Sequence, residues 1–348
     1  MNRLFRKEVV EASLYSVKAE EGIKLNQNEA PWDLPLELKV AISERLLKLD
    51  WNRYPLAEVI TLKKKIAKRD GVMPDQVVVA NGSNVLIQGL ILAASLYGKV
   101  LIPDPTFSVY EHQARLFGNA VIKIPLAEDF TLPIEKTLAA IRKDKPNIIF
   151  VPNPNAPTGN LFDKQALHRI VSTGVLTVID EAYFPFSRET SVEWLKDFPN
   201  LVILRTFSKA FALAGVRLGY ALGESEAMAQ LEKVLLPFCV SRVTCAIADE
   251  ILQESDYAER YVKDIMKEHD RLFSKLKEMK GVSVYPSAAN FFLFQVTQAK
   301  VVAAKLLKVG VIVRDVSNGT SLLEALRVSV GTPDENDVFL KALKKALG

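Results

Sequence analysis

Short apolar runs that alternate with helical segments constrain the fold of this chain more than any other feature. The runs, which we interpret as strands, are residues 77–80, 100–102, 120–124, 148–151, 176–179, 201–204 and 218–222. Strands that are apolar on both faces belong in a parallel sheet that helices cover on both sides. The pattern therefore predicts a large α/β domain with a mostly parallel, seven-stranded sheet.

The pattern changes after about residue 225. Long helical segments at residues 224–236 and 246–279 precede short strands at 282–285, 291–294, 311–313 and 325–330, which predicts a smaller α+β domain at the C-terminus. Residues 1–30 are polar and have little periodicity, so they are expected to form an arm over the body of the protein or over a partner subunit. The predicted divisions are an arm at 1–30, a large domain at 31–240 and a small domain at 241–348.

Charge and composition exclude several classes of protein. The formal net charge of +4 comes from basic residues scattered among acids, which does not resemble a nucleic-acid-binding surface. Residues 85–103, the longest apolar stretch, are interrupted in a way that suits a buried helix better than a membrane span. The N-terminus lacks the apolar core of a signal peptide, and Cys239 and Cys245 have no CxxC spacing. We expect a cytoplasmic protein without a metal site and without nucleic-acid or membrane partners.

Lys209 is the candidate catalytic lysine. It follows the predicted strand 201–204, at the kind of strand end where α/β proteins hold ligands. Apolar neighbours such as Ala210 and Phe211 would desolvate its ammonium group and lower its pKa, as in a lysine that forms a Schiff base. The alternative is an ordinary surface lysine.

Other strand ends carry polar groups as well. The Gly82-Ser83-Asn84 turn precedes a helix and offers an anion site, although it can also be an ordinary turn. Asp180 comes directly after the strand 176–179, where the alternative role is a helix cap. Residues 152–159 are a proline-rich run that presents two side-chain amides. Arg217 is close enough to Lys209 for one anion to be held jointly by four elements, namely Thr206, Ser208, Arg217 and the Gly82 turn.

A lysine, a phosphate cradle and a strand-end acid are the groups that pyridoxal 5′-phosphate requires. The lysine bonds to its aldehyde, the acid keeps its ring nitrogen protonated, and the cradle holds its phosphate. The sequence therefore predicts this cofactor.

Specific motifs extend the argument to nearly the whole chain. They are Leu25-Asn26-Gln27-Asn28-Glu29, Arg53-Tyr54-Pro55, Asp180-Glu181-Ala182-Tyr183, the run from Ser208 to Gly219, and Asn290-Phe291. With these motifs the chain resembles the fold-type I, class II pyridoxal-phosphate aminotransferases, and within them the histidinol-phosphate aminotransferases. The resemblance implies a homodimer with its active sites at the subunit interface.

The resemblance also implies roles for individual residues. Lys209 would bond to the cofactor, Asp180 would pair with its ring nitrogen, Tyr183 would contact its ring hydroxyl, and Tyr110 would stack on its ring. The phosphate would be held by Ser83, Asn84, Thr206, Ser208 and Arg217, together with Tyr54 from the other subunit. One position departs from the family pattern: Ala156 replaces the usual asparagine, so Asn155 becomes the candidate for the amide at the ring hydroxyl.

Substrate recognition is expected to depend on Arg314 and Arg327, which match two arginines of the family. Arg327 would hold the phosphate of histidinol phosphate or a carboxylate of glutamate, and Arg314 and the partner's Tyr15 would add contacts. Asn28 in the first motif is a further candidate substrate-binding residue. Arg314 can alternatively form a surface salt bridge, and Tyr15 can simply pack.

The resemblance implies transamination between glutamate and a phosphate-bearing keto compound, imidazole acetol phosphate. Two enzyme alternatives share the same motifs: an aromatic or broad-specificity aminotransferase, and a threonine-phosphate decarboxylase of cobalamin synthesis. A non-catalytic half of a transcription regulator would need a helix-turn-helix domain, for which the first thirty residues are too short and polar.

Overall fold

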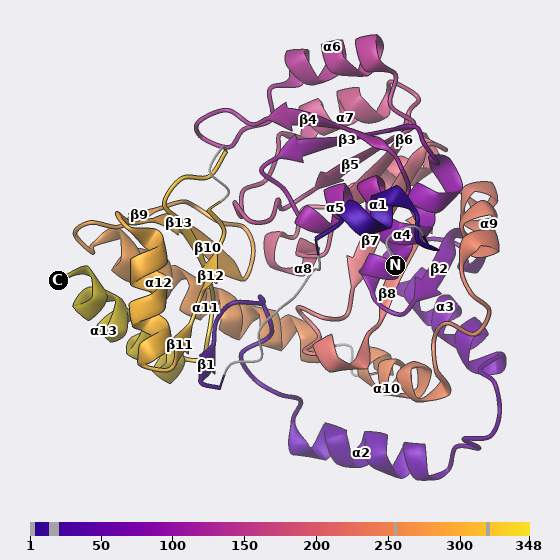
Figure 1. Cartoon of the computed structure of the whole chain (residues 1–348). Helices are drawn as coiled ribbons and strands as arrows, with labels where there is room; N and C mark the ends of the chain where they lie inside the picture. The colour runs from indigo at the N-terminus through magenta and orange to yellow at the C-terminus, as the bar shows by residue number, and fades with distance from the viewer. Residues whose placement is uncertain (1–3, 14–20, 254–255, 318–320) are drawn as a thin grey trace.

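The computed structural model describes residues 4–13, 21–253, 256–317 and 321–348, and Figure 1 shows their arrangement. A seven-stranded sheet with helices on both sides forms the large part of the molecule. Its strands, in spatial order, are β2 (Val77–Ala80), β8 (Gly219–Gly223), β7 (Leu201–Thr206), β6 (Leu176–Asp180), β5 (Ile148–Pro152), β3 (Lys99–Asp104) and β4 (Ala120–Pro125). β8 is antiparallel to both of its neighbours and every other pair is parallel, which confirms the predicted mostly parallel sheet.

Both faces of this sheet are buried, as the apolar runs predict. Along β7, Val202 and Leu204 pack in the core under one layer of helices, whereas Leu201 and Ile203 belong to the core on the opposite face. Successive side chains of a strand point to opposite faces, so a strand buried on both sides must be apolar throughout.

The helices of the large part, in chain order, are α2 (Leu36–Leu47), α3 (Ala57–Asp70), α4 (Ser83–Ala94), α5 (Ser108–Leu116), α6 (Ile134–Asp144), α7 (Lys164–Val171), α8 (Phe184–Ser187), α9 (Ser225–Val234) and α10 (Arg242–Gln253). Helices α4, α5 and α9 share one core with the sheet, and α3, α6 and α7 contribute to the core on the other face. α10, which the predicted boundary at residue 241 assigns to the small domain, packs against α2 and α3.

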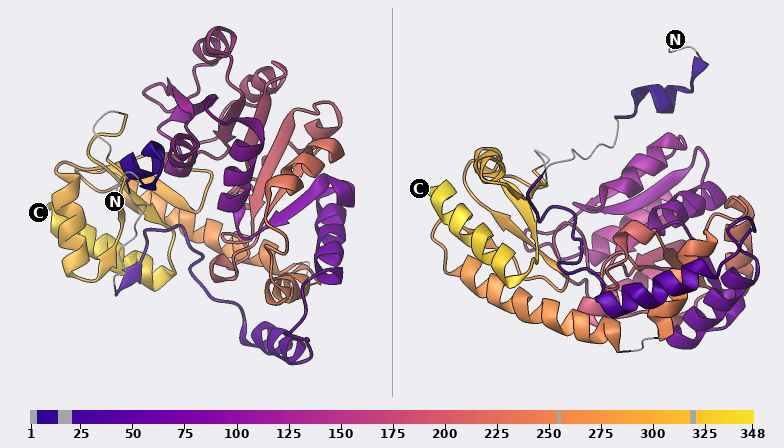
Figure 2. Two further views of the ribbon diagram at one scale, coloured as in Figure 1. Left: turned by 45° about the vertical axis from the view of Figure 1, so that its right-hand side comes forward. Right: turned by 90° about the horizontal axis from the view of Figure 1, so that it is seen from below.

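The small C-terminal domain has a four-stranded antiparallel sheet in the order β12 (Arg314–Asp315), β13 (Ala325–Ser329), β10 (Phe291–Gln295) and β9 (Ser283–Val284). Helices α11 (Tyr257–Lys277), α12 (Ala299–Lys308) and α13 (Pro333–Leu347) accompany it. Figure 2 shows α11 running from the large part of the molecule to the small domain. This architecture confirms the predicted α+β domain.

Two details differ from the sequence prediction. Residues 246–279 were expected to form one connector helix, but α10 and α11 are separate, and Asp256 before α11 is a residue type that favours a helix start. Residues 311–313 were expected to form one strand, but β11 (Val311–Ile312) and β12 are distinct because they pair with different partners. Arg314 therefore lies within a strand.

The N-terminal segment is attached to the small domain. After α1 (Lys7–Glu11), the short strand β1 (Ile23–Lys24) pairs in parallel with β11. The backbone N–H of Leu25 donates to the carbonyl of Ile312, and the N–H of Ser329 donates to the carbonyl of Leu25. Residues 23–25 are thus hydrogen-bonded to the small domain, and the chain then passes between the two domains.

Within the described residues, no helix combines the length and the apolar character needed to cross a bilayer.

Candidate active site

A cavity of about 750 Å³ lies where the carboxyl end of the large sheet meets the small domain. Most of the residues singled out in the sequence meet on its walls: Asn28, Ser83, Asn84, Tyr110, Asp180, Tyr183, Thr206, Ser208, Lys209, Arg217, Arg314 and Arg327. They come from segments far apart in the sequence. They converge because the parallel strands β5, β6 and β7 end at the same edge of the sheet.

Lys209 follows β7 and extends into this cavity. Its Nζ donates a hydrogen bond to the carbonyl oxygen of Gln27 at 2.7 Å. Burial, with a smaller contribution from the positive charge of Arg327, lowers the pKa of Lys209 to about 7. A large fraction of this lysine is therefore the free amine at neutral pH, which is the form that attacks an aldehyde.

Asp180 ends β6, and its carboxylate lies in the same cavity. It accepts a hydrogen bond from the hydroxyl of Tyr110 at 2.7 Å and another from the backbone N–H of Ala182 at 3.1 Å. Burial raises the pKa of Asp180 to about 6. A buried carboxylate of this kind suits a positively charged ring nitrogen, because that partner would favour its ionised form.

Tyr110 has a second contact besides Asp180. Its ring stacks on Phe150, with centroids 4.9 Å apart and an interplanar angle of 15°. Burial, the charge of Asp180 and its hydrogen bond to Asp180 together raise the pKa of Tyr110 well above its usual value, so the phenol stays neutral.

Asn28 links Tyr183 to the small domain. Its Nδ2 donates to the hydroxyl of Tyr183 at 2.8 Å, and its backbone N–H donates to Oγ of Ser329 at 2.8 Å. The side chain of Asn290 donates to the carbonyl oxygen of Asn28 at 3.2 Å. Asn28 has a φ of 53°, a left-handed conformation that asparagine adopts more readily than most residues. Its amide is thus presented to Tyr183 in a fixed direction.

The predicted phosphate cradle forms at the N-terminus of α4. Gly82 precedes the helix with a φ of 81°, and a Cβ at this position would lie 2.5 Å from Nη2 of Arg217. Nη1 of Arg217 lies 3.4 Å from Oγ of Ser208, and the Ser208 N–H donates to Oγ1 of Thr206 at 3.1 Å. This arrangement suits a phosphate, because it combines a helix N-terminus, two hydroxyls and a guanidinium group. Only glycine at position 82 leaves the space between them open.

Arg314 and Arg327 lie on the opposite side of the cavity, on the small domain. They are directly paired across β12 and β13. Nη2 of Arg327 donates to the carbonyl of Asn26 at 2.8 Å, and its guanidinium carbon lies 5.3 Å from the centre of the Phe291 ring. The two side chains give this wall of the cavity two positive charges, and that of Arg327 acts on Lys209.

A buried ion-pair network holds the strand ends in place. Arg205 of β7 contacts Glu181, which directly follows β6, at 2.7 Å and Asp70 at the end of α3 at 2.9 Å. Its guanidinium carbon also lies 3.9 Å from the centre of the Phe184 ring. The network joins Glu181, the residue after Asp180, to Arg205, which lies four residues before Lys209, and thereby links the ends of β6 and β7.

Two expected site residues, Asn155 and Tyr54, are not among the residues that line this cavity, and Gly82 lies beside it, directly before Ser83. Asn155 is fully buried, and its amide hydrogens donate to the carbonyl of Pro105 at 3.0 Å and to Oγ1 of Thr158 at 2.7 Å. The structure therefore places this amide between its own loop and the loop that follows β3. Tyr54 is 72% exposed and stacks on Phe238, away from the cavity of its own chain. Tyr15 lies outside the described residues.

The cavity also contains five charged residues that sequence reasoning missed, namely Glu29, Asp104, Glu111, Lys123 and Asp315. Glu29 belongs to a quoted motif and could have been singled out there. Glu111 and Lys123 carry no sequence signal, since they meet only because α5 packs against β4.

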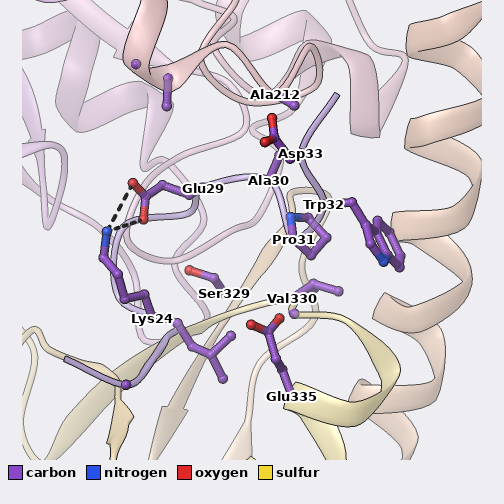
Figure 3. A pocket seen from close by; sticks show the side chains of 15 residues that line it. Lys24, Glu29, Ala30, Pro31, Trp32, Asp33, Ala212, Ser329, Val330 and Glu335 are labelled. Carbon is purple, nitrogen blue, oxygen red and sulfur yellow. Dashed lines mark hydrogen bonds and ion pairs between the residues drawn. The ribbon is translucent and has the colours of Figure 1, made fainter. Parts of the chain in front are cut away.

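Glu29 also borders a second, smaller cavity of about 380 Å³ (Figure 3). There its carboxylate pairs with Lys24 at 3.2 Å, as the dashed lines in Figure 3 indicate. The negative charge of Glu29 opposes the lowering of the Lys209 pKa. Glu29 therefore lines both cavities.

The fold and these groups are those of a pyridoxal-phosphate enzyme. Lys209 can bond to the aldehyde, Asp180 can pair with the ring nitrogen, and the site at the N-terminus of α4 can bind the phosphate. The model of the family "Aminotransferase class I and II" matches residues 20–343. The chain belongs to this family, which confirms the predicted class and the predicted cofactor, pyridoxal 5′-phosphate.

Individual relatives agree with the family model. The chain is 39% identical over 329 residues to the histidinol-phosphate aminotransferase of Aquifex aeolicus, covering 94% of this chain and 93% of the relative. It is 37% identical over 331 residues to that of Chlorobaculum tepidum, covering 94% of each. The predicted resemblance is thus confirmed.

Solved structures share the fold. The histidinol-phosphate aminotransferase of Sinorhizobium meliloti, solved in complex with pyridoxal-5′-phosphate, superposes with a TM-score of 0.88 at 23% identity, covering 99% of this chain and 97% of that one. The histidinol-phosphate aminotransferase of Clostridium acetobutylicum superposes with a TM-score of 0.85 at 25% identity, covering 93% and 98%.

Proposed function

We propose that this enzyme transfers the amino group of glutamate to imidazole acetol phosphate, producing 2-oxoglutarate and L-histidinol phosphate in histidine biosynthesis. The observation that carries the proposal is the pairing of Arg314 and Arg327 on the cavity wall. Two adjacent guanidinium groups suit a phosphate dianion better than a single carboxylate, because each can donate two hydrogen bonds. The names of the curated relatives support the same reaction.

The residues around the cavity would bind each part of the cofactor. Ser83, Asn84, Thr206, Ser208 and Arg217 would hold its phosphate. Asp180 would pair with its ring nitrogen, and Tyr183, oriented by Asn28, would reach its ring hydroxyl. Tyr110 would border the ring while it holds the Asp180 carboxylate.

When bound, pyridoxal phosphate supplies an aldehyde that bonds to amines and a ring that stores the electron pair left when a substrate carbon loses its proton. Lys209 performs the proton transfer. Its Nζ would accept the proton from the α carbon of the substrate and deliver it to the carbon of the cofactor's aldehyde group, since a pKa of about 7 lets the same amine act as base and acid near neutral pH. Arg327 holds the anionic end of the substrate and thereby places the α carbon near Nζ.

Comparing amino acceptors tests this function. The enzyme is first charged with glutamate, and imidazole acetol phosphate, phenylpyruvate and oxaloacetate are then added separately. The rate at which the visible absorbance of the bound cofactor returns is measured for each. The phosphate compound is expected to react fastest. A phenylpyruvate rate that equals or exceeds it would contradict the proposal in favour of an aromatic or broad-specificity enzyme, and release of carbon dioxide from threonine phosphate would indicate a decarboxylase.

We further propose a homodimer in which Tyr54 and Tyr15 complete the site of the partner. Large apolar side chains are exposed along α2, the following loop and the segment after α9: Leu36, Val40, Leu47, Trp51, Tyr54, Leu56, Leu236 and Phe238. Exposed apolar surface of this extent is typical of a protein interface. Tyr54 lies on this surface, where it can reach a second copy. The free cysteines Cys239 and Cys245 also support a cytoplasmic location.

Mixing two inactive variants tests the shared site. Lys209→Ala removes the catalytic amine, and Tyr54→Ala removes the contact to the partner's phosphate site. In a mixed dimer one site contains intact copies of both residues, so mixing under conditions of subunit exchange should restore activity. Activity that stays at the level of the separate variants, in samples shown to contain mixed dimers, contradicts the shared site.

A further inference from the structure

The buried ion-pair network of Arg205, Glu181 and Asp70 lies directly behind the residues expected to hold the cofactor. None of the three lines the cavity, and their side chains are only 4%, 1% and 3% exposed, respectively. Successive residues at the end of a strand point to opposite faces of the sheet. Asp180 points toward Tyr110 on one face. Glu181 points toward Arg205 on the other, so the network holds the end of β6 from the opposite face.

Glu181 is fixed at several atoms. Its Oε2 accepts hydrogen bonds from Nε and Nη2 of Arg205 at 3.0 and 2.7 Å, and its Oε1 accepts one from the backbone N–H of Ser191 at 2.7 Å. The hydroxyl of Thr190 lies 3.0 and 2.9 Å from the two oxygens. The backbone N–H of Glu181 donates to the carbonyl of Leu204 on β7 at 2.8 Å. The residue that follows β6 is thus held by both its backbone and its side chain.

Stability alone does not account for this network. Taking charged groups out of water costs free energy that an ion pair only partly recovers, and apolar residues in the same place are often equally stable or more so. Asp70 adds to this cost, because it is the last residue of α3 and lies at the negative end of the helix dipole. A buried guanidinium group between two carboxylates instead provides a fixed geometry, since the planar fork of arginine donates only in set directions.

Asp180 requires such a fixed geometry. The charged hydrogen bond between a carboxylate and a protonated ring nitrogen depends on both distance and direction. On the cavity side, Tyr110 and the backbone N–H of Ala182 orient the carboxyl group itself. The network on the other face fixes the backbone to which this carboxyl group is attached.

We propose that Glu181 and Arg205 are positioning residues for Asp180: they fix the chain directly after it and thereby keep its carboxylate opposite the ring nitrogen of pyridoxal phosphate. This inference rests on the proposed function, in which Asp180 pairs with that nitrogen. Neither Glu181 nor Arg205 lines the cavity, so both act through Asp180.

Binding of two cofactor forms to the cofactor-free protein tests this role. In 1-deazapyridoxal 5′-phosphate a C–H group replaces the ring nitrogen, so Asp180 has no charged partner. Glu181→Gln keeps the size of the side chain but turns an amide donor toward Ser191 or Arg205, whose groups also donate. It should weaken pyridoxal phosphate by about tenfold and leave the deaza analogue within about twofold in a fluorescence titration.

Arg205→Lys provides a second variant that keeps the positive charge. An ammonium group lacks the planar fork that binds Glu181 and Asp70 together, so this variant should weaken pyridoxal phosphate selectively as well. Near-UV circular dichroism confirms the fold of each variant, and either variant alone is sufficient for the test.

Glu268→Gln is the matched control. Glu268 is also a buried glutamate held by an arginine, with Arg271 at 2.9 Å, but it lies on α11, far along the chain from Asp180. Its replacement should change the dissociation constant of neither cofactor form. A double variant provides a further check: Glu181→Gln should add no loss to that of Asp180→Asn, because the network acts through Asp180.

Three results would overturn the inference: equal weakening of both cofactor forms by Glu181→Gln, no weakening of pyridoxal phosphate by Glu181→Gln and Arg205→Lys, or additive losses in the double variant. Asp180→Asn separates these failures from failure of the proposed function. If Asp180→Asn itself weakens both cofactor forms equally, Asp180 does not pair with the ring nitrogen, and its proposed role fails together with the inference. If only the Glu181 and Arg205 variants lack selectivity, the role of Asp180 stands and the positioning role is wrong.

Discussion

Arg314 and Arg327 face each other directly across the antiparallel strands β12 and β13. Like charges in directly opposed positions destabilise a sheet, so this pairing costs stability unless an anion lies between the two guanidinium groups. The hydrogen bond from Arg327 to the carbonyl of Asn26 fixes one of the two side chains. This cost would be offset by the bound anion if the two arginines hold the substrate as proposed.

Replacing each arginine should change kcat/KM for the two substrates to different extents. Arg327→Gln should lower kcat/KM for both glutamate and histidinol phosphate by about 100-fold, because a bidentate charged contact is lost. Arg314→Gln should lower kcat/KM for histidinol phosphate by about tenfold and affect glutamate less, since only the phosphate needs both cations. Steady-state kinetics with each substrate measures this difference. Equal losses for the two substrates in Arg314→Gln would contradict the shared phosphate site.

Lys209→Met should abolish the visible absorbance of covalently bound cofactor. The same variant should stabilise the cofactor-free protein at neutral pH, because burial of the ammonium group lowers the pKa of Lys209 below its unfolded value and so disfavours the folded state. The expected gain is on the order of a few kcal/mol, is largest at or below pH 7, and disappears near the ordinary lysine pKa. Thermal unfolding from pH 6 to 10 measures it. An unchanged visible band in purified Lys209→Met would eliminate Lys209 as the cofactor lysine.

The uptake of pyridoxal phosphate by the cofactor-free protein should depend on pH through Lys209. Its pKa of about 7 means that the reactive amine increases between pH 6 and 8 and then reaches a plateau. Asp180, whose pKa burial raises to about 6, becomes ionised over the lower part of this range. Stopped-flow absorbance measures the rate of uptake. A rate that continues to rise toward pH 10 would show that Lys209 has an ordinary pKa.

Gly82→Ala should weaken binding of the cofactor by about tenfold or more, because the added Cβ would lie 2.5 Å from Nη2 of Arg217 and displace this phosphate ligand. Gly71→Ala is the matched control: Gly71 has a φ of 70° but nothing within 4 Å of an added Cβ. Gly71→Ala should lose about 1 to 2 kcal/mol of stability because Gly71 has the left-handed helical conformation. Gly82→Ala should lose at least as much, because φ 81° and ψ 156° belong to a region that essentially only glycine adopts. Only Gly82→Ala should change the dissociation constant in a fluorescence titration with pyridoxal phosphate. Equal dissociation constants of pyridoxal phosphate for the two variants would contradict the phosphate-binding role of the Gly82 turn.

Much of the fold and of the inner site could be predicted because the large sheet repeats one simple pattern. Each buried strand ends at a polar residue, so the order of apolar and polar residues along the chain is enough to place Asp180 and Lys209 at the same edge of the sheet. The Gly82 turn before α4 could be predicted in the same way, because it directly follows the apolar strand β2.

The remaining parts of the site depend on packing between separate elements. The contact of Glu111 with Lys123 requires α5 to lie on β4, which neither segment encodes alone. The direct pairing of Arg314 with Arg327 requires β12 to leave β11 and join another sheet, whereas the sequence pattern indicates only one strand. The amide of Asn155 was expected in the cavity, but neighbouring loop groups satisfy its hydrogen bonds.

The short strand β1 has a consequence for the catalytic amine. Ile23 and Lys24 are bonded to the small domain, and three residues after them the carbonyl of Gln27 accepts the hydrogen bond of Lys209, which belongs to the large domain. The backbone that pairs with the small domain thus reaches the catalytic amine of the large domain within three residues. The carbonyls of Asn26 and Gln27 accept hydrogen bonds from Arg327 and Lys209, respectively, so two adjacent residues of this segment contact one domain each.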